Sequence, residues 1–272
     1  MSFAADEIST ENGAPLYLYD FVYSGKAWYL TNNVRPLRHA NNDYVPTMIK
    51  HNTPDNSGDF LKSSCTITVA YDSEIGMLFR EQPPSEMVNV RVFVAHEDPS
   101  TDTVTPMVVW MGHVSNVAWK GVTCDLTTDS AFKALSRLGV VRKFSRPCTH
   151  TLYSKPCGVD IKTHEFQSVV TAINGTKVTL SNPDADAMAG GIIRYKNART
   201  EVIERRSILD ADATSITLSV QPSALEVGAT VTLVHGCPHT IDVCRARFNN
   251  TDNYGGQPYV PPKNPFGNNP IW

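Results

Sequence analysis

Alternating apolar and polar positions dominate the chain as far as Ser130 and predict β-strands. In residues 16–23 aromatic side chains fill every second position: Tyr17, Tyr19, Phe21 and Tyr23. A period of two is typical of a strand with one buried face. The turn formers Ser24, Gly25 and Lys26 follow, so we expect a hairpin into residues 27–30.

The same alternation recurs further along the chain. It covers residues 65–69, 88–94 and 107–119, and Lys120-Gly121 then predicts a turn into residues 122–126. Gly112 interrupts the longest of these segments, and we expect a bulge or bend there. This part of the sequence therefore predicts one β-rich domain, which we bound at residues 1–147, where a Cys- and Pro-rich stretch begins.

Two short helices are expected. Asp129 and Ser130 form an N-cap pair, which predicts a helix over residues 131–138 that stops at Gly139. A second helix is expected over residues 239–248, with Cys237 at its start and Pro238 in its first turn.

Residues 166–234 read as an insertion that carries an internal repeat. Val178-Thr179-Leu180-Ser181 recurs 38 positions later as Ile216-Thr217-Leu218-Ser219. At the same offset Gly190 matches Gly228, and Ile193 matches Val231. Two such copies packed on each other would form a small all-β domain. Two similar hairpins that arose by chance are the alternative.

The expected fold class is mainly β with a few short helices, an α+β arrangement. We expect the β-rich domain (1–147), a cysteine module made of residues 148–165 and 235–272, and the inserted two-repeat domain (166–234). The final segment, residues 249–272, holds five prolines. Proline at this density disfavours regular elements, so we expect an extended arm.

Composition narrows the possible locations and partners. The 272 residues are 41% hydrophobic and carry a formal net charge of -3, which gives no long-range attraction to nucleic acid or to an anionic membrane. The first residues include Asp6 and Glu7 where a secretory signal would carry basic residues, and no segment has the ~20 apolar residues of a membrane span. We expect synthesis in a cytoplasm, no nucleic-acid binding and no stable membrane insertion.

No catalytic pattern emerges. The chain has no Gly-x-Ser-x-Gly elbow, and His164-Glu165 lacks the second histidine of a zinc-protease helix. We therefore expect a protein that is not an enzyme.

The six cysteines divide into two groups. Cys65 and Cys124 lie on the apolar faces of their strands, where a thiol packs as a small hydrophobe. The others follow the pattern Cys-x8-Cys, a long gap over positions 158–236, then Cys-x6-Cys, and they are Cys148, Cys157, Cys237 and Cys244. Because the gap corresponds to the insertion, we expect these four thiols to converge on one metal site.

The residues alone leave the kind of site open. Structural zinc sites favour paired ligands spaced x2 to x4, and the present spacings are looser. An iron–sulfur cluster is larger and accepts four thiolates from more widely spaced positions. Two disulfides are the third possibility, which a reducing compartment disfavours. Four histidines lie near these cysteines in the sequence: His150, His164, His235 and His239. Each could replace one cysteine as a ligand, contact a ligand without binding the metal, or be exposed to solvent.

Three segments together resemble a known family. They are Cys148-Thr149-His150-x2-Tyr153-x3-Cys157-Gly158, then Cys237-Pro238-x5-Cys244, and then Phe248-Asn249-Asn250-x3-Tyr254-Gly255-Gly256. This arrangement is similar to the tail tip protein L family of phage lambda and to the hub proteins of gene transfer agents. The likeness extends more weakly to the N-terminal strands and leaves out residues 166–234.

The resemblance implies a structural tail tip or baseplate hub of a siphophage-type virion. Such proteins form a ring, a homotrimer, that joins the distal tail protein to the central tail fibre, near the tape measure protein. The resemblance also implies a [4Fe-4S] cluster bound by the cysteines at positions 148, 157, 237 and 244. A redox or electron-transfer iron–sulfur protein and a zinc-stapled binding module are the alternative hypotheses.

Overall fold

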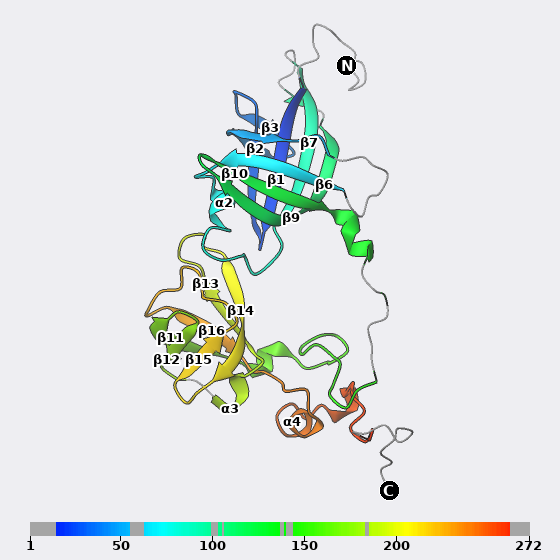
Figure 1. Ribbon diagram of the computed structural model, residues 1–272, viewed down its shortest axis with the longest axis vertical. Coiled ribbons are helices and arrows are strands. Elements are labelled where there is room, and N and C mark those ends of the chain that lie inside the picture. Colours follow the sequence, from blue (N-terminus) through cyan, green and yellow to red (C-terminus); the bar gives the residue numbers. More distant parts are fainter. Residues whose placement is uncertain are drawn as a thin grey trace. The chain divides into compact units, whose positions relative to one another are not determined.

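The computed structural model describes residues 15–54, 63–98, 103–104, 106–136, 139, 144–182 and 185–261 (Figure 1). The chain divides into two compact units, Met1–Arg137 and Leu138–Trp272. Strands dominate both units and the helices are short, which confirms the expected fold class. None of the helices in the described parts of the chain is long and apolar enough to cross a membrane.

The first unit is built on a ten-stranded sheet. Its order is β3-β4-β2-β1-β7-β9-β10-β6-β5, and β8 pairs with β7. The strands are β1 (Pro15–Tyr23), β2 (Lys26–Thr31), β3 (Leu37–His39), β4 (Asn42–Pro46), β5 (Ile49–His51), β6 (Ser64–Ala70), β7 (Asn89–Asp98), β8 (Thr103–Val104), β9 (Met107–Lys120) and β10 (Thr123–Ser130). A one-turn helix, α2 (Glu74–Met77), lies between β6 and β7.

The period-two pattern placed one face of β1 and of β6 in the core correctly, but β1 is also buried on its other face, at Leu16, Leu18 and Asp20. Tyr19, Phe21 and Tyr23 of β1 are fully buried, and so are the alternate positions of β6. Cys65 and Cys124 belong to this core, as expected. Burial raises the pKa of each of these two thiols to about 11. They are therefore protonated packing residues.

Two local expectations for this unit were met only in part. The described part of the segment 131–138 is not an α-helix but a 3-10 helix, η1 (Ala131–Ser136), although Ser130 Oγ accepts a bond from Phe132 N at 3.3 Å as a cap would. None of its side chains is buried, so no packing supports an α-helix here. The sheet register shifts beside Val109 and Ser115, not at Gly112. Gly112 is required because a Cβ there would lie 2.0 Å from the carbonyl oxygen of Asp129.

The second unit contains a closed six-stranded barrel, drawn in green to orange in Figure 1. The strand order is β11-β12-β15-β14-β13-β16. The strands are β11 (Glu165–Asn174), β12 (Lys177–Leu180), β13 (Ile192–Lys196), β14 (Ile203–Ala211), β15 (Ser215–Leu218) and β16 (Thr230–Val234), with α3 (Ala185–Met188) before β13. Closure leaves no unpaired sheet edge within this barrel.

The barrel follows the sequence repeat and has approximate two-fold symmetry. The offset that takes Val178 to Ile216 also maps β11, β12 and β13 onto β14, β15 and β16. Val178 and Ile216 are direct register partners in the antiparallel β12–β15 pair. The N–H groups of Gly190 and Gly228 donate to Ile208 and Val170, which are again equivalent positions. Two chance hairpins would not reproduce this hydrogen-bond pattern, which favours an internal duplication.

The same symmetry defines where the barrel joins the rest of the unit. At one end Asn197 N donates to Val202 O at 2.8 Å, and the loop 198–201 connects the two copies. At the equivalent place on the other end His235 N donates to His164 O at 3.1 Å. There the chain does not close into a loop: both strands continue into the cysteine-bearing segments. The barrel thus holds next to each other the two chain segments that connect it to the cysteines, one before β11 and one after β16.

Short elements surround this junction. They are η2 (Ile161–His164), α4 (Ile241–Ala246) and η3 (Thr251–Asn253). The expected helix over residues 239–248 is shorter than predicted and begins after its N-cap Thr240. His239 has a φ of 61°, a left-handed conformation that cannot belong to an α-helix. Cys244 therefore lies on the helix, whereas Cys237 precedes it.

Candidate metal centre

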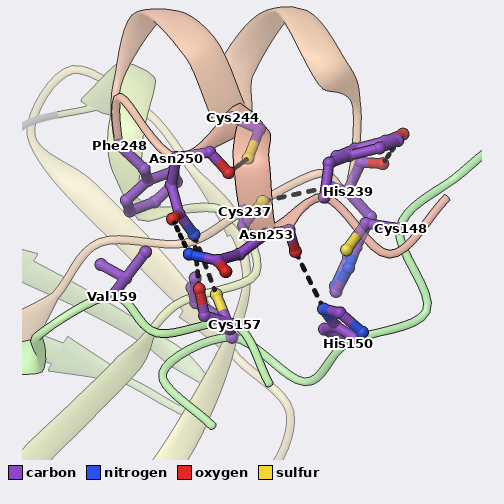
Figure 2. Close-up of a pocket in the computed structure, with 12 residues that line it drawn as sticks. Cys148, His150, Cys157, Val159, Cys237, His239, Cys244, Phe248, Asn250 and Asn253 are labelled. Atoms are coloured by element: carbon purple, nitrogen blue, oxygen red, sulfur yellow. Dashed lines mark hydrogen bonds between the residues drawn. The ribbon is translucent and has the colours of Figure 1, made fainter. Parts of the chain in front are cut away.

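Cys148, Cys157, Cys237 and Cys244 line one pocket, together with residues from three neighbouring segments (Figure 2). The pocket holds about 340 Å³ of space not filled by atoms, with solvent at its mouth included. Its apolar wall consists of Leu152, Val159 and Phe248. Its polar wall consists of His150, His239, Asn250, Asn253 and Tyr254. The fold thus brings two cysteine pairs together across the whole barrel insertion.

Main-chain contacts hold the first pair in place. Cys148 N donates to His239 O at 2.9 Å, which ties the first cysteine segment to the second. Cys157 follows a tight turn that Gly158 closes, its N–H donating to Ser154 O at 2.9 Å. Gly158 has a φ of 73°, so glycine is the favoured residue after the ligand candidate.

The second pair is placed by the barrel and by α4. Cys237 follows Gly236, whose N–H donates to the carbonyl oxygen of Ala187 in α3 at 2.6 Å. A Cβ at Gly236 would lie 2.0 Å from Ala189 O, so the chain leaves the barrel where only glycine fits. Cys244 is buried on α4 and is 8% exposed.

Three of the four sulfurs face nitrogen donors. Gly255 N lies 3.3 Å from Cys148 Sγ, and His239 N lies 3.3 Å from Cys237 Sγ. Asn250 Nδ2 is 3.9 Å from Cys157 Sγ and also donates to the Cys157 carbonyl. Hydrogen bonds of this kind stabilise thiolates and orient metal ligands. The fourth thiol, Cys244, donates to Asn250 O at 3.2 Å.

Burial raises the pKa of the Cys237 and Cys244 thiols. Charges at the other cysteines of the pocket raise both pKa values further, because the four groups lie close together. Four uncompensated thiolates are thus unfavourable in this pocket. A bound cationic group would remove that penalty.

The Tyr-Gly-Gly sequence closes the pocket from the C-terminal side. Tyr254 OH donates to Arg146 O and His239 O at 2.8 and 3.0 Å. A Cβ at Gly255 would lie 2.6 Å from the His150 ring, and one at Gly256 would lie 2.5 Å from Arg146 O. The start of the expected arm is therefore folded onto the cysteine loop. Residues beyond 261 lie outside the described part of the chain.

The four candidate histidines separate into two pairs. His150 and His239 line the pocket. His164 packs against Phe248 with ring centroids 4.8 Å apart, and His235 packs against Phe166 at 5.5 Å. Sequence reasoning assigned no role at the site to Asn250, Asn253 or Tyr254. The sequence feature that could have indicated a role for these three residues was their position in the Phe-Asn-Asn and Tyr-Gly-Gly segment shortly after Cys244.

The donor set consists of four thiols, a set that can hold either a zinc ion or an iron–sulfur cluster. Within the described ranges, no three His, Cys, Asp or Glu side chains form a group that could hold one metal ion. The four thiols line one pocket that has an apolar wall, and backbone N–H groups face two of the sulfurs. Four sulfurs, an apolar shell and hydrogen bonds to sulfur are the features with which proteins bind and tune such clusters.

Comparisons with known proteins add two likenesses in sequence. The family described as "Phage conserved hypothetical protein BR0599" matches residues 186–264, which include Cys237, Cys244 and the glycine pair. A protein of Xylella fastidiosa (strain 9a5c), described as "Uncharacterized protein", is 34% identical over 165 residues. That match covers 57% of this chain and 34% of the relative, so the chain spans about a third of that protein's length.

The third likeness is structural. A chain in the "Virion of native gene transfer agent (GTA) particle" has a TM-score of 0.77 and 17% sequence identity to this chain. The match covers 96% of this chain and 93% of that one. The two chains therefore share a fold over nearly their whole lengths.

Proposed function

We propose that this protein is a structural component of a phage-type tail, and that it acts as a tail tip or baseplate hub. The phage family match, the fold shared with a chain of a virion and the three segments that resemble hub proteins, two of which contain cysteine pairs, all support this role. In this proposal the protein is not an enzyme. It forms a homotrimeric ring at the virion tail tip and contacts the distal tail protein, the central tail fibre and the tape measure protein.

We further propose that Cys148, Cys157, Cys237 and Cys244 hold a [4Fe-4S] cluster. The observation that carries this proposal is the convergence of two cysteine pairs, separated in the chain by the whole barrel, on one pocket with N–H donors at its sulfurs. A thiolate-bound cluster contributes its binding free energy to folding. Its role here is to link the loop before the barrel to the segment after it.

The metal content tests this proposal directly. Protein purified without oxygen should be brown, absorb near about 400 nm and contain about four iron atoms per chain. A colourless protein with one zinc ion per chain would support the zinc-stapled alternative and overturn the cluster. A cluster that is reduced and reoxidised reversibly in intact particles, without effect on their stability, would favour the redox alternative.

Substitution of one ligand tests the structural role. Cys244→Ser should lose the iron and lower the thermal stability of the second unit, because three thiolates and a hydroxyl bind the cluster poorly. Cys124→Ala is the matched control: it removes a buried thiol of the first unit and should retain the full iron content. Full iron content and unchanged stability in Cys244→Ser would contradict the proposed role of the cluster in linking the two cysteine segments.

The location is tested on particles. Gold-labelled antibody against the first unit should mark one end of the tail in electron micrographs of intact virions. Labelling of the capsid, or of no particle component, would contradict the hub assignment and leave the metal assignment standing.

A further inference from the structure

Asn250 contacts both cysteine pairs through separate groups. Its backbone N–H donates to Cys244 O at 3.1 Å, and its backbone carbonyl accepts a bond from Cys244 Sγ at 3.2 Å. Its side-chain Nδ2 donates to Cys157 O at 2.5 Å and lies 3.9 Å from Cys157 Sγ. Asn250 therefore joins one cysteine of the first pair to one cysteine of the second, although it follows Cys157 by 93 residues.

The side chain of Asn250 does not cap the short helix that it precedes. Asn250 is the N-cap of η3, a position where asparagine usually accepts a bond from a backbone N–H of the first turn. In η3 the N-cap side chain makes no such bond. Its Oδ1 atom instead accepts a bond from Asn253 Nδ2 at 2.6 Å. The formation of η3 therefore does not explain why this side chain reaches across to Cys157.

Asn253 determines which end of the Asn250 amide faces Cys157. Figure 2 shows Asn250 joined by dashed lines to Asn253 through one end of its amide and to Cys157 through the other. Gly158 leaves room for this arrangement, since a Cβ there would lie 3.2 Å from Asn253 Nδ2. The orientation matters because an N–H group stabilises negative charge on sulfur, whereas an oxygen in the same place would repel it.

We propose that Asn250 is a positioning residue of the cysteine site, which links the two cysteine pairs and provides a neutral N–H donor beside the Cys157 sulfur. The inference rests on the proposed function in taking the four cysteines as ligands of one metal group. Asn253 acts through Asn250, because it holds the amide in this orientation. Position 250 requires an amide, which combines an acceptor for Asn253 with a donor for Cys157. An ionised aspartate would offer only acceptors.

Asn250→Asp tests this role with almost no change in side-chain size. Aspartate is as good an N-cap as asparagine, so a residue that only supported η3 would tolerate the change. We expect instead a lower iron content, and loss of the remaining iron to a chelator about 10 to 100 times faster than from the native chain. Asn249→Asp is the matched control, since it makes the same change of charge at the neighbouring, exposed position.

The reduction potential tests the N–H donor separately. Asn250→Leu removes the donor without adding charge, and the potential of the bound cluster should shift to a more negative value, because hydrogen bonds to sulfur favour the reduced cluster. Asn253→Leu should give a smaller shift in the same direction, since the Asn250 amide is retained but no longer held. Native potential in Asn250→Leu, together with native iron retention in Asn250→Asp, would overturn the inference.

The metal-free chain separates this inference from the proposed function. If the purified native protein contains no iron, the cluster assignment fails, and thermal unfolding of the metal-free variants then tests the link between the cysteine pairs. Asn250→Asp should unfold at a lower temperature than Asn249→Asp, because the Cys157 carbonyl loses its donor. Equal unfolding temperatures of these two variants would show that Asn250 does not link the pairs.

Discussion

Main-chain N–H groups and one amide face the cysteine sulfurs, and no charged side chain lines the pocket among the residues described. The donors on Gly255 and His239 belong to segments that reach the pocket only after the chain has folded back. Spacing and neighbouring prolines could therefore indicate which cysteines form the site. They could not indicate that Gly255, 107 residues after Cys148, would provide a donor to its sulfur.

Asp125 gives a residue-scale prediction about pH. Thr68 Oγ1 donates to its carboxylate at 2.7 Å, and Lys120 Nζ lies 2.8 Å from its other oxygen. The hydrogen bond from Lys120, followed by that from Thr68, lowers the pKa of the Asp125 carboxyl below its usual value. Its contribution to stability is thus present above the pKa of the unfolded chain and is lost as the pH falls through the lowered folded pKa.

We expect Asp125→Asn to lower the free energy of unfolding by about 1 kcal/mol at pH 7. The difference from the native chain should shrink as the pH falls from 4 towards about 2. Urea unfolding across this range measures it. Asp43→Asn is the control, since Asp43 pairs with Arg38 at an exposed position and should change little. A pH-independent difference for Asp125→Asn would contradict the assignment.

At the scale of elements, side-chain packing and local backbone conformation determined the type of η1 and the start of α4, which the sequence pattern did not predict. The N-cap Ser130 was identified correctly, yet η1 stays a 3-10 turn because it buries no side chain. The helix after Pro238 starts later than expected because His239 takes a left-handed conformation while its N–H bonds the Cys237 sulfur. Strands were easier to predict, because alternation records burial directly and one face of β6 and β10 is fully covered.

The glycine pair after η3 yields an element-scale prediction. Gly256→Ala should destabilise the second unit by about 2 kcal/mol or more, because its Cβ would lie 2.5 Å from Arg146 O and the backbone must move. The Gly255 N–H would move with it, so iron content should also fall. Thermal unfolding and iron analysis measure both effects.

Gly139→Ala is the control for this substitution. Gly139 has nothing within 4 Å of an added Cβ, and so the variant should behave like the native chain. Equal stability and iron content in Gly256→Ala would show that the 254–256 segment does not support the pocket.

At the scale of the whole molecule, the internal repeat is the sequence feature that predicted the most about the fold. The offset that relates Val178 to Ile216 implied two copies, and glycines 190 and 228 marked equivalent turns. Closure into a single barrel did not follow from the repeat, because it depends on pairing β12 with β15 and β13 with β16. A local pattern carries no information about such pairs, since their strands are far apart in the chain.

The paired connections at His164 and His235 predict that the barrel can be removed. We expect a chain in which residues 165–234 are replaced by the four-residue loop Ala-Arg-Thr-Glu, the sequence of residues 198–201, to bind iron still. The iron content should fall below the native ratio, because the bond from Gly236 N–H to Ala187 O that helps to place Cys237 is lost. Removal of one repeat alone, residues 165–202, is the control. It leaves three strands that cannot close, and we expect an insoluble product. A soluble barrel-free chain that binds no iron would show that the barrel is an essential part of the site.

The place of the barrel between the two cysteine pairs also has a consequence for the timing of synthesis. Cys244 leaves the ribosome 87 residues after Cys157. At roughly 5 to 20 residues per second, this delay is about 4 to 17 seconds. All six barrel strands are made within that interval, so the barrel can close while the first two cysteines still lack their partners. The last barrel strand ends at Val234, ten residues before Cys244, so the cysteine pocket can be completed only after all six strands have been synthesised.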